Sequence, residues 1–299
     1  MKRLPAPEER QPVRAPQRVQ YTRWGPREGL LFGTGGVPES LESKDTVSAL
    51  RFLRAFGLDA MELEFVRGTF PGEETARLIA RTAEEQGIRL TAHGPYFINL
   101  NSPEPDKIAA SRGRIVRTAR TGSLCGAESV TFHAGFYHDD PPETVFRRIE
   151  AELVRVMEDV RLLGVALRPE TTGKPSQFGS VEEVLRLSAG IEGLHPCIDW
   201  SHLHARTGAC NSAREFRAVL DAVRGALGKD ELGILHMHIS GIQFGPRGEK
   251  KHVDLRESDF NYADLLRVLM DEGASGFVIC ESPHREDDAL LMKELYGKL

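Results

Sequence analysis

A regular alternation of short apolar segments with longer amphipathic segments runs through most of this chain, and it limits the possible folds more than any other feature. The segments with the length and apolar character of buried β-strands are residues 30–34, 60–65, 88–92, 129–132, 165–168, 194–198, 233–239 and 277–280. Those with helical periodicity are residues 43–56, 72–86, 105–124, 142–163, 181–188, 212–227, 262–272 and 287–296. Strands that alternate with helices in this way lie parallel and are joined by right-handed crossovers.

Eight strand–helix units over roughly 270 residues predict an α/β fold, a single (β/α)8 (TIM) barrel, for which about 250 residues are typical. An open, doubly wound sheet is the alternative. Such sheets usually have fewer strands and often carry a glycine-rich phosphate loop after the first one. The segment Gly33-Thr34-Gly35-Gly36 lacks the full spacing of that loop, and the barrel is therefore preferred.

Composition bounds the class of protein. Hydrophobic residues make up 40% of the 299 residues and charged residues 28%, which is ordinary for a globular protein. The formal net charge of −5 argues against a generally basic coat for nucleic acid, but it permits a local basic patch. The four cysteines show no CxxC spacing, and no apolar run approaches the roughly 18 residues of a membrane span. We expect a cytoplasmic monomer that does not contact membranes.

The first 28 residues differ from the rest of the chain. They are rich in Pro, Arg, Gln and Glu and have no apolar period. This composition predicts a flexible N-terminal extension over residues 1–28, followed by the barrel over residues 29–299.

In barrels of this class the active site lies at the carboxyl ends of the strands. Six consecutive predicted strands end there with an imidazole or a carboxylate: His93, His133, Glu170, Asp199 (with His202 in the loop that follows), His238 and Glu281. Taken alone, each of these residues could be explained without a metal, as a hydrogen-bonded histidine, a salt-bridge partner or a helix cap. Together they favour a metal site, because burying so many ionisable groups without a metal is costly. Imidazole with carboxylate suits zinc, with manganese or iron as alternatives.

The remaining histidines are weaker candidates. His236 lies two residues before His238 and points the same way, but it is further from the rim, so we expect a core or supporting role. His252 lies within residues 245–252, which by themselves predict a solvated basic turn. The histidines in predicted loops or at a strand start are assigned no role: His138, His195, His204 and His284.

At these residues the chain resembles the endonuclease IV family of apurinic/apyrimidinic endonucleases, within the xylose-isomerase-like barrel superfamily. The resemblance extends from about Gly29 to the end of the chain. The segments that carry it are His93-Gly94-Pro95-Tyr96-Phe97-Ile98-Asn99-Leu100, Phe132-His133-Ala134-Gly135, Pro169-Glu170-Thr171, Cys197-Ile198-Asp199-Trp200-Ser201-His202, Met237-His238-Ile239 and Glu281.

The resemblance implies a cluster of two or three zinc ions. The implied ligands are His93, His133 and Glu170 for the first ion, Glu170, Asp199, His238 and Glu281 for the second, and His202 and His252 for the third. Glu170 and Glu281 are the implied catalytic carboxylates. The implied reaction is hydrolysis of the phosphodiester bond on the 5′ side of an abasic site in double-stranded DNA, which clustered divalent metals suit.

The resemblance also implies contacts with DNA. Tyr96 matches a family aromatic residue beside the damaged nucleotide, although packing under the rim would explain it too. The candidates for contacts with DNA phosphates are Arg67, Arg247, Lys250 and Lys251, although exposed loop charges are usually just solvated.

Two departures from the family pattern stand out. The family has an Asp two residues before the histidine that matches His252, and Lys250 occupies that place here, which leaves Glu249 or Asp254 as substitutes. The segment Phe65-Val66-Arg67-Gly68 also lacks the longer Arg- and aromatic-bearing sequence that better-known bacterial members insert into DNA. Weaker binding of abasic DNA, or a different substrate, follows from the second departure.

Two other functions are consistent with the same residues. The first is a single-metal sugar isomerase or epimerase of the superfamily, with the ligand set Glu170, Asp199, His238 and Glu281. His202 could then bind a sugar hydroxyl, but such an enzyme has no need of His93 and His133. The second is a metal-dependent DNA-lesion binder that does not cleave.

Overall fold

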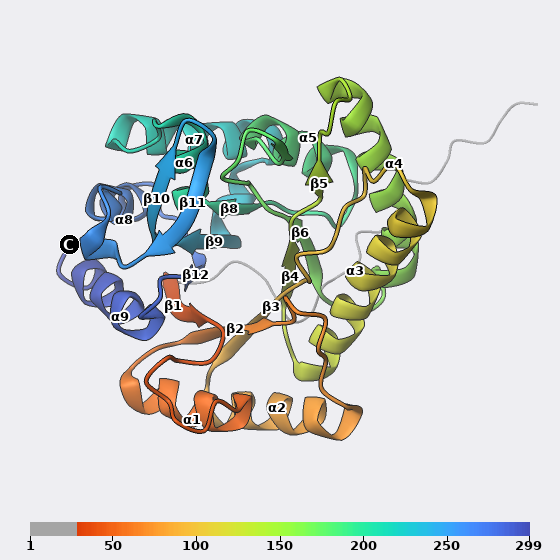
Figure 1. Ribbon diagram of the computed structural model, residues 1–299. Helices are drawn as coiled ribbons and strands as arrows, with labels where there is room; N and C mark the ends of the chain where they lie inside the picture. Colours follow the sequence, from red (N-terminus) through yellow and green to blue (C-terminus); the bar gives the residue numbers. More distant parts are fainter. Residues whose placement is uncertain (1–28) are drawn as a thin grey trace, which may run out of the picture.

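The computed structural model describes residues 29–299, and within this range the chain forms a ring of parallel strands surrounded by helices (Figure 1). The eight barrel strands of this part of the chain are β1 (Leu30–Gly35), β2 (Ala60–Glu64), β3 (Arg89–His93), β4 (Ser129–Phe132), β6 (Ala166–Pro169), β8 (Cys197–Asp199), β9 (Leu235–Ile239) and β12 (Gly276–Cys280). The predicted (β/α)8 barrel is confirmed. The predicted flexible extension, residues 1–28, lies outside the described residues.

The strands follow one another around the barrel in the order β6-β4-β3-β2-β1-β12-β9-β8. Neighbours in this order pair over ladders of three residues or more. Between the two outer strands, β6 and β8, backbone pairing is reduced to isolated bridges, Leu167 with Leu194 and Glu170 with Cys197, and side-chain hydrogen bonds such as those between Thr171 and Asp199 also cross this seam. The barrel is therefore nearly closed, and its backbone pairing is least regular at the β6–β8 seam.

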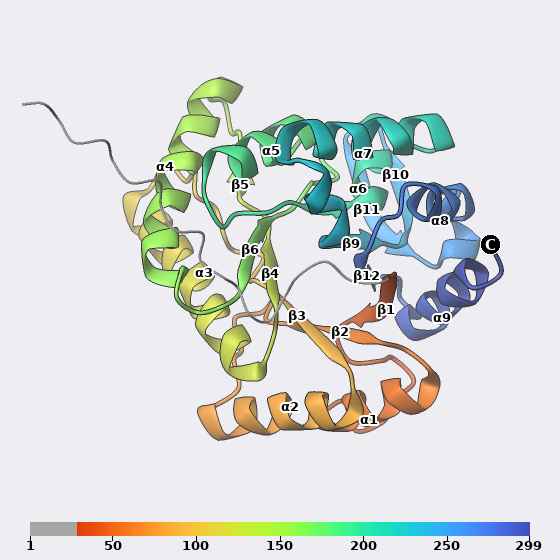
Figure 2. The same cartoon turned by 180° about the vertical axis from the view of Figure 1, so that it is seen from behind.

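Helices cover the outside of the barrel on all sides (Figures 1 and 2). The α-helices of residues 29–299 are α1 (Thr46–Phe56), α2 (Glu73–Gln86), α3 (Pro105–Cys125), α4 (Pro142–Val160), α5 (Val181–Gly190), α6 (Trp200–Thr207), α7 (Ala213–Leu227), α8 (Tyr262–Asp271) and α9 (Arg285–Tyr296). Two short 3-10 helices, η1 (Lys229–Gly233) and η2 (Leu255–Glu257), complete the helical elements. None of these helices is long and apolar enough to cross a membrane.

The helices bury the apolar faces that the sequence pattern predicts. In α4, for example, Val145, Ile149, Leu153 and Val156 recur at helical spacing and are fully or almost fully buried. Gly87 ends α2 in the left-handed conformation at φ +65°, which a glycine adopts without strain.

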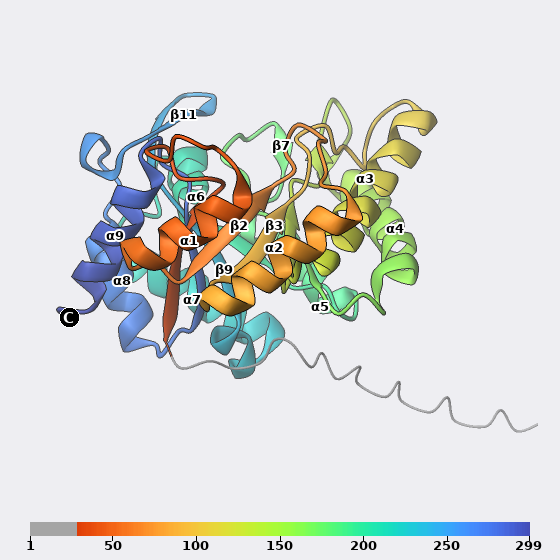
Figure 3. The same cartoon turned by 90° about the horizontal axis from the view of Figure 1, so that it is seen from below.

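Two elements at the carboxyl end of the barrel differ from the predictions. Residues 245–252, predicted as a solvated turn, belong to an antiparallel hairpin of β10 (Gly241–Gly245) and β11 (Gly248–Val253). The segment after Asp199, predicted as a loop, is helix α6. A second small pair, β5 (Gly135–Phe136) with β7 (Gln177–Phe178), lies at the same end, and Figure 3 shows β7 and β11 beyond the barrel strands.

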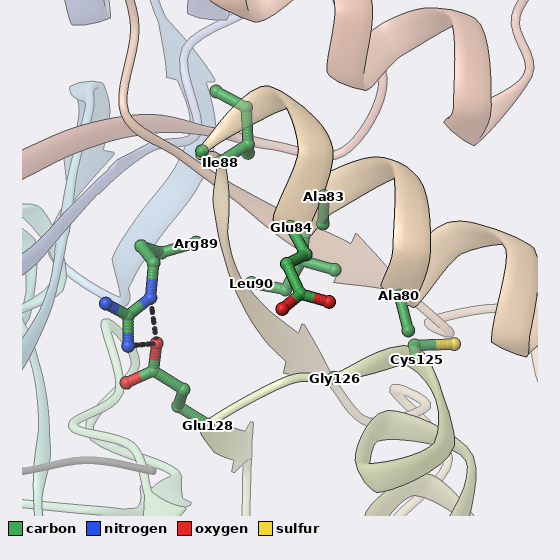
Figure 4. Close-up of a pocket in the computed structure, with 10 residues that line it drawn as sticks. Ala80, Ala83, Glu84, Ile88, Arg89, Leu90, Cys125, Gly126 and Glu128 are labelled. Atoms are coloured by element: carbon green, nitrogen blue, oxygen red, sulfur yellow. Dashed lines mark hydrogen bonds and ion pairs between the residues drawn. The ribbon is translucent and has the colours of Figure 1, made fainter.

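A pocket lies near the opposite, amino-terminal end of β3, between α2 and α3 (Figure 4). Its charged side chains include Arg89 and Glu128, which form an ion pair, and Glu84. The predicted metal ligands do not line it, so the chemistry of the chain is concentrated at the other end of the barrel.

Candidate metal centre

The strand-end side chains predicted as metal ligands meet at the carboxyl end of the barrel. Their ligand atoms fall into three groups, each with all atoms within 4.8 Å of one another. The first group is His93, His133 and Glu170, the second is Glu170, Asp199, His238 and Glu281, and the third is His202, Glu249 and His252.

The first group is built around one oxygen of Glu170. Oε2 of Glu170 lies 3.1 Å from Nε2 of His93 and 3.2 Å from Nε2 of His133. The other ring nitrogen of His93, Nδ1, donates to the backbone carbonyl of Gly94 at 2.7 Å. This hydrogen bond orients the ring so that Nε2 faces the group.

The second group faces the other oxygen of Glu170. Nδ1 of His238 lies 3.4 Å from Oε1 of Glu170, 3.6 Å from Oε1 of Glu281 and 3.9 Å from Oδ2 of Asp199. Because its two oxygens face different groups, Glu170 has the geometry of a carboxylate that bridges two ions.

The third group lies under the hairpin. Nε2 of His202 is 3.4 Å from Nε2 of His252 and 3.6 Å from Oε2 of Glu249. Both rings are oriented through Nδ1, which donates to the carbonyl of Thr171 at 3.0 Å in His202 and to that of Glu281 at 3.2 Å in His252. In both histidines Nε2 is the nitrogen that faces the group.

A β-bulge explains why Glu249 faces the third group and Lys250 does not. In the hairpin, Gln243 pairs with Lys251 and Phe244 pairs with Glu249, so Lys250 is an extra residue on β11. Glu249 thereby shares a face with His252 despite their spacing of three, and Lys250 is exposed. The other substitute for the missing Asp, Asp254, lies 2.7 Å from Nδ1 of His284 instead.

Asp199 has two roles at once. Its Oδ1 accepts a hydrogen bond from the backbone N–H of His202 at 2.7 Å, which caps α6. Its Oδ2 faces the second group. Asp199 can therefore cap α6 and be a candidate metal ligand at the same time.

Two carboxylates of β2, the buried Glu62 and the half-buried Glu64, were not among the predicted site residues. Glu62 is fully buried and lies against His238, and together with Glu64 and Glu281 it forms a further group of acidic oxygens. The signal was available, since two Glu at alternate positions interrupt an otherwise apolar strand. Burial raises the pKa of Glu64 to about 8.

Histidines and carboxylates balance each other's charge in this centre. Burial opposes a charge on His93, but Glu170 and the other nearby carboxylates raise its pKa to about 10. Burial likewise opposes a charge on His202, while Asp199 and Glu170 raise its pKa to about 10. Burial would raise the pKa of Glu170, yet His133 and His238 hold it well below its usual range. Protonated imidazoles thus balance the negative charge of the nearby carboxylates, as a divalent cation would.

These residues fit a metal cluster. Among the described residues, three buried atoms that face the second group have no hydrogen-bond partner: Oε1 of Glu170, Oδ2 of Asp199 and Nδ1 of His238. Buried polar atoms without a partner are costly, and a divalent cation between these atoms would supply the missing interaction. The mixture of nitrogen and oxygen ligands suits zinc, manganese or iron.

The candidate DNA contacts lie around the same rim. The ring of Tyr96 is 5.9 Å from that of His93 and is 59% exposed, and its neighbour Phe97 is 56% exposed. The backbone N–H of Tyr96 donates to the carbonyl of Val66, which brings the exposed Arg67 close to this aromatic pair. The other candidates are exposed on the β10–β11 hairpin: Arg247, Lys250 and Lys251.

The chain belongs to the xylose isomerase-like TIM barrel family, whose model matches residues 50–296. An uncharacterized protein of Methanocaldococcus jannaschii is 43% identical over 273 residues, which are 90% of this chain and 98% of that protein. The "Probable endonuclease 4" of Mycobacterium tuberculosis is 27% identical over 232 residues, 76% of this chain and 84% of the relative.

Solved structures show the same fold. The crystal structure of endonuclease IV from Thermus thermophilus has a TM-score of 0.69 at 20% identity, covering 90% of this chain and 100% of that one. A D-tagatose 3-epimerase-like protein has a TM-score of 0.69 at 17% identity, covering 90% of this chain and 96% of that one. The resemblance to endonuclease IV predicted from the motifs is confirmed, and the fold is shared with sugar epimerases as well.

Proposed function

We propose that this protein is a zinc-dependent phosphodiesterase that cleaves double-stranded DNA on the 5′ side of abasic sites, as part of base excision repair. The observation that carries the proposal is the first ligand group. His93 and His133 meet the oxygen of Glu170 that does not face the second group. A one-metal enzyme would not need this second set of ligands.

A cluster of divalent cations would suit the cleavage of a phosphodiester, because it lowers the pKa of water and stabilises charge on the attacking and leaving oxygens. In this proposal Glu170 and Glu281 are the catalytic carboxylates. They would help to hold such a cluster, with Glu170 shared between the first and the second ligand group.

The surroundings of the centre suit a DNA duplex. Tyr96 and Phe97 offer exposed aromatic rings next to His93, and Arg114 lies over the ring of Phe97 at 5.7 Å. Aromatic rings stack on unpaired bases, and neighbouring cations contact phosphates. Phosphate contacts on the other side of the rim would come from the basic residues of the hairpin: Arg247, Lys250 and Lys251.

The test combines metal analysis with a nicking assay on a duplex that carries one abasic site. We expect at least two transition-metal ions per chain and a nick on the 5′ side of the lesion. His133→Ala should lose an ion and most of the cleavage, because it removes one of the three ligands of the first group. His284→Ala is the matched control, since His284 is exposed and pairs with Asp254 outside the centre.

The second candidate is a single-metal sugar isomerase or epimerase. The second ligand group favours it, because Glu170, Asp199, His238 and Glu281 form a complete four-ligand site by themselves. One ion per chain, sugar isomerisation and no nicking would establish this function in place of the nuclease. Binding of abasic duplex without cleavage by the fully metal-loaded protein would instead identify a lesion binder.

A further inference from the structure

A chain of polar side chains crosses the barrel interior beneath the metal centre, with Glu62 at its middle. Oε2 of Glu62 accepts a hydrogen bond from the hydroxyl of Thr91 at 2.7 Å and lies 3.0 Å from Nε2 of His236. Its other oxygen, Oε1, lies 3.0 Å from Nε2 of His238. All of these side chains are fully buried. The two contacts of Glu62 with the histidines are close ion-pair contacts and not aligned hydrogen bonds, because Oε1 of Glu62 and Nε2 of both His236 and His238 have no hydrogen-bond partner among the described residues.

The far end of this chain is a hydrogen bond between His236 and Ser129. Nδ1 of His236 lies 2.8 Å from the hydroxyl of Ser129. The other ring nitrogen of His236, Nε2, faces Glu62.

His238 is oriented differently from the other histidines of the centre. In His93, His202 and His252, Nδ1 donates to a backbone carbonyl and Nε2 faces a ligand group, although Nδ1 of His202 also lies 3.2 Å from Glu170 and from Asp199. In His238 the order is reversed. Nδ1 faces the second group, and Nε2 faces Glu62. Glu62 thus occupies the place that a backbone carbonyl has for the other three.

We propose that Glu62 is a positioning residue, whose buried carboxylate beside Nε2 of His238 keeps the ring proton on that nitrogen and so makes Nδ1 the atom that binds metal in the second group. A carboxylate in this place fixes both the tautomer and the orientation of a ligand imidazole and increases its basicity. The proposal rests on the metal centre of the proposed function and not on its substrate.

The first test measures zinc affinity by competition with a chromogenic chelator. Glu62→Gln keeps the size of the side chain but removes the negative charge that faces Nε2 of His238. We expect zinc binding to weaken about 10- to 100-fold. Ser129→Ala is the matched control. It removes a buried hydrogen bond from the same chain but leaves the contact of Glu62 with His238, and it should bind zinc like the parent protein.

The second test uses the parent protein, so it is decisive even if the Glu62 variant does not fold. Long-range 1H–15N spectra of the zinc-loaded protein show which nitrogen of each histidine carries a proton. The signals of His238 are identified by their absence in His238→Gln. We expect a proton on Nε2 of His238 and on Nδ1 of His93.

Two results would overturn the proposal: a folded Glu62→Gln protein with parental zinc affinity, or a His238 ring with its proton on Nδ1. Neither measurement involves DNA. Failure to cleave abasic DNA would therefore count against the proposed function alone, and the role of Glu62 would be judged separately.

Discussion

Asp199 shows how much depends on individual atoms in this protein. Oδ1 caps α6, and Oδ2 faces the second ligand group. Burial raises the pKa of this carboxyl group to about 6, so its charged form is less favourable here than in water when no cation is bound. The two roles can therefore be separated by substitution.

We expect Asp199→Asn to keep the cap and lose the ion of the second group, because an amide oxygen caps a helix well but carries no charge. Asp199→Ala should lose both, with a cost to stability of about 1 kcal/mol. Urea unfolding in the presence of a chelator, together with zinc content, separates the two variants. A zinc-replete Asn variant would contradict the assignment of Oδ2.

At the residue scale, the sequence predicted that the candidate ligands lie together at one rim but not how their side chains are oriented. His93, His133, Glu170 and Glu281 could be found because each ends a recognisable strand, and strand ends share one rim. Glu62 lies in the middle of β2, where a buried carboxylate is explained only by its contacts with His236 and His238. Those contacts join distant parts of the chain, so no local pattern contains them.

At the element scale, the bulge on β11 decides which side chain completes the third group. A regular strand would place Lys250 on the same face as His252, because side chains alternate with a period of two. The extra residue shifts that period and turns Glu249 inward. The third group therefore contains a carboxylate, although Lys250 occupies the place of the Asp in the family pattern.

Substitutions on β11 test this compensation. Glu249→Gln should lower the metal content of the saturated protein by one ion, because it removes the only carboxylate of the third group. Lys250→Ala, on the adjacent exposed residue, should leave the metal content unchanged. Equal metal loss in both variants, or in neither, would show that Glu249 is not a ligand.

The bulge also marks the limit of prediction from periodicity. The eight barrel strands and their covering helices were predictable because each is a run with one consistent period. Helix α6 has only eight residues and begins at a cap that doubles as a site residue, so its sequence resembles a loop. The hairpin of β10 and β11 carries charged residues and a shifted register, which hide the alternation typical of strands.

At the scale of the whole molecule, the centre gathers much of the buried charge of the protein at one end of the barrel. In the absence of a cation, His93 and His202 are protonated at neutral pH, because nearby carboxylates raise the pKa of each to about 10 despite burial. A cation must displace these protons to reach the ring nitrogens.

Zinc binding should therefore release protons, and zinc affinity should increase with pH throughout the range below about 10. Asp199, with a pKa of about 6, contributes little to this effect at pH values well above 6. Calorimetric titrations with zinc in two buffers with different heats of ionisation measure directly the number of protons released on binding. An affinity that does not change between neutral and mildly alkaline pH would contradict the protonation of His93 and His202.

The reduced backbone pairing at the β6–β8 seam means that a metal ion could affect the closure of the barrel. Glu170 follows β6 and Asp199 ends β8, so these two carboxylates lie on opposite sides of the seam, where backbone pairing is reduced to isolated bridges. An ion bound by both carboxylates would link β6 to β8 at the place where their backbone pairing is least regular. Loss of the ion and loosening of the β6–β8 seam would then occur together, so the closure of the barrel would depend on whether the metal centre is occupied.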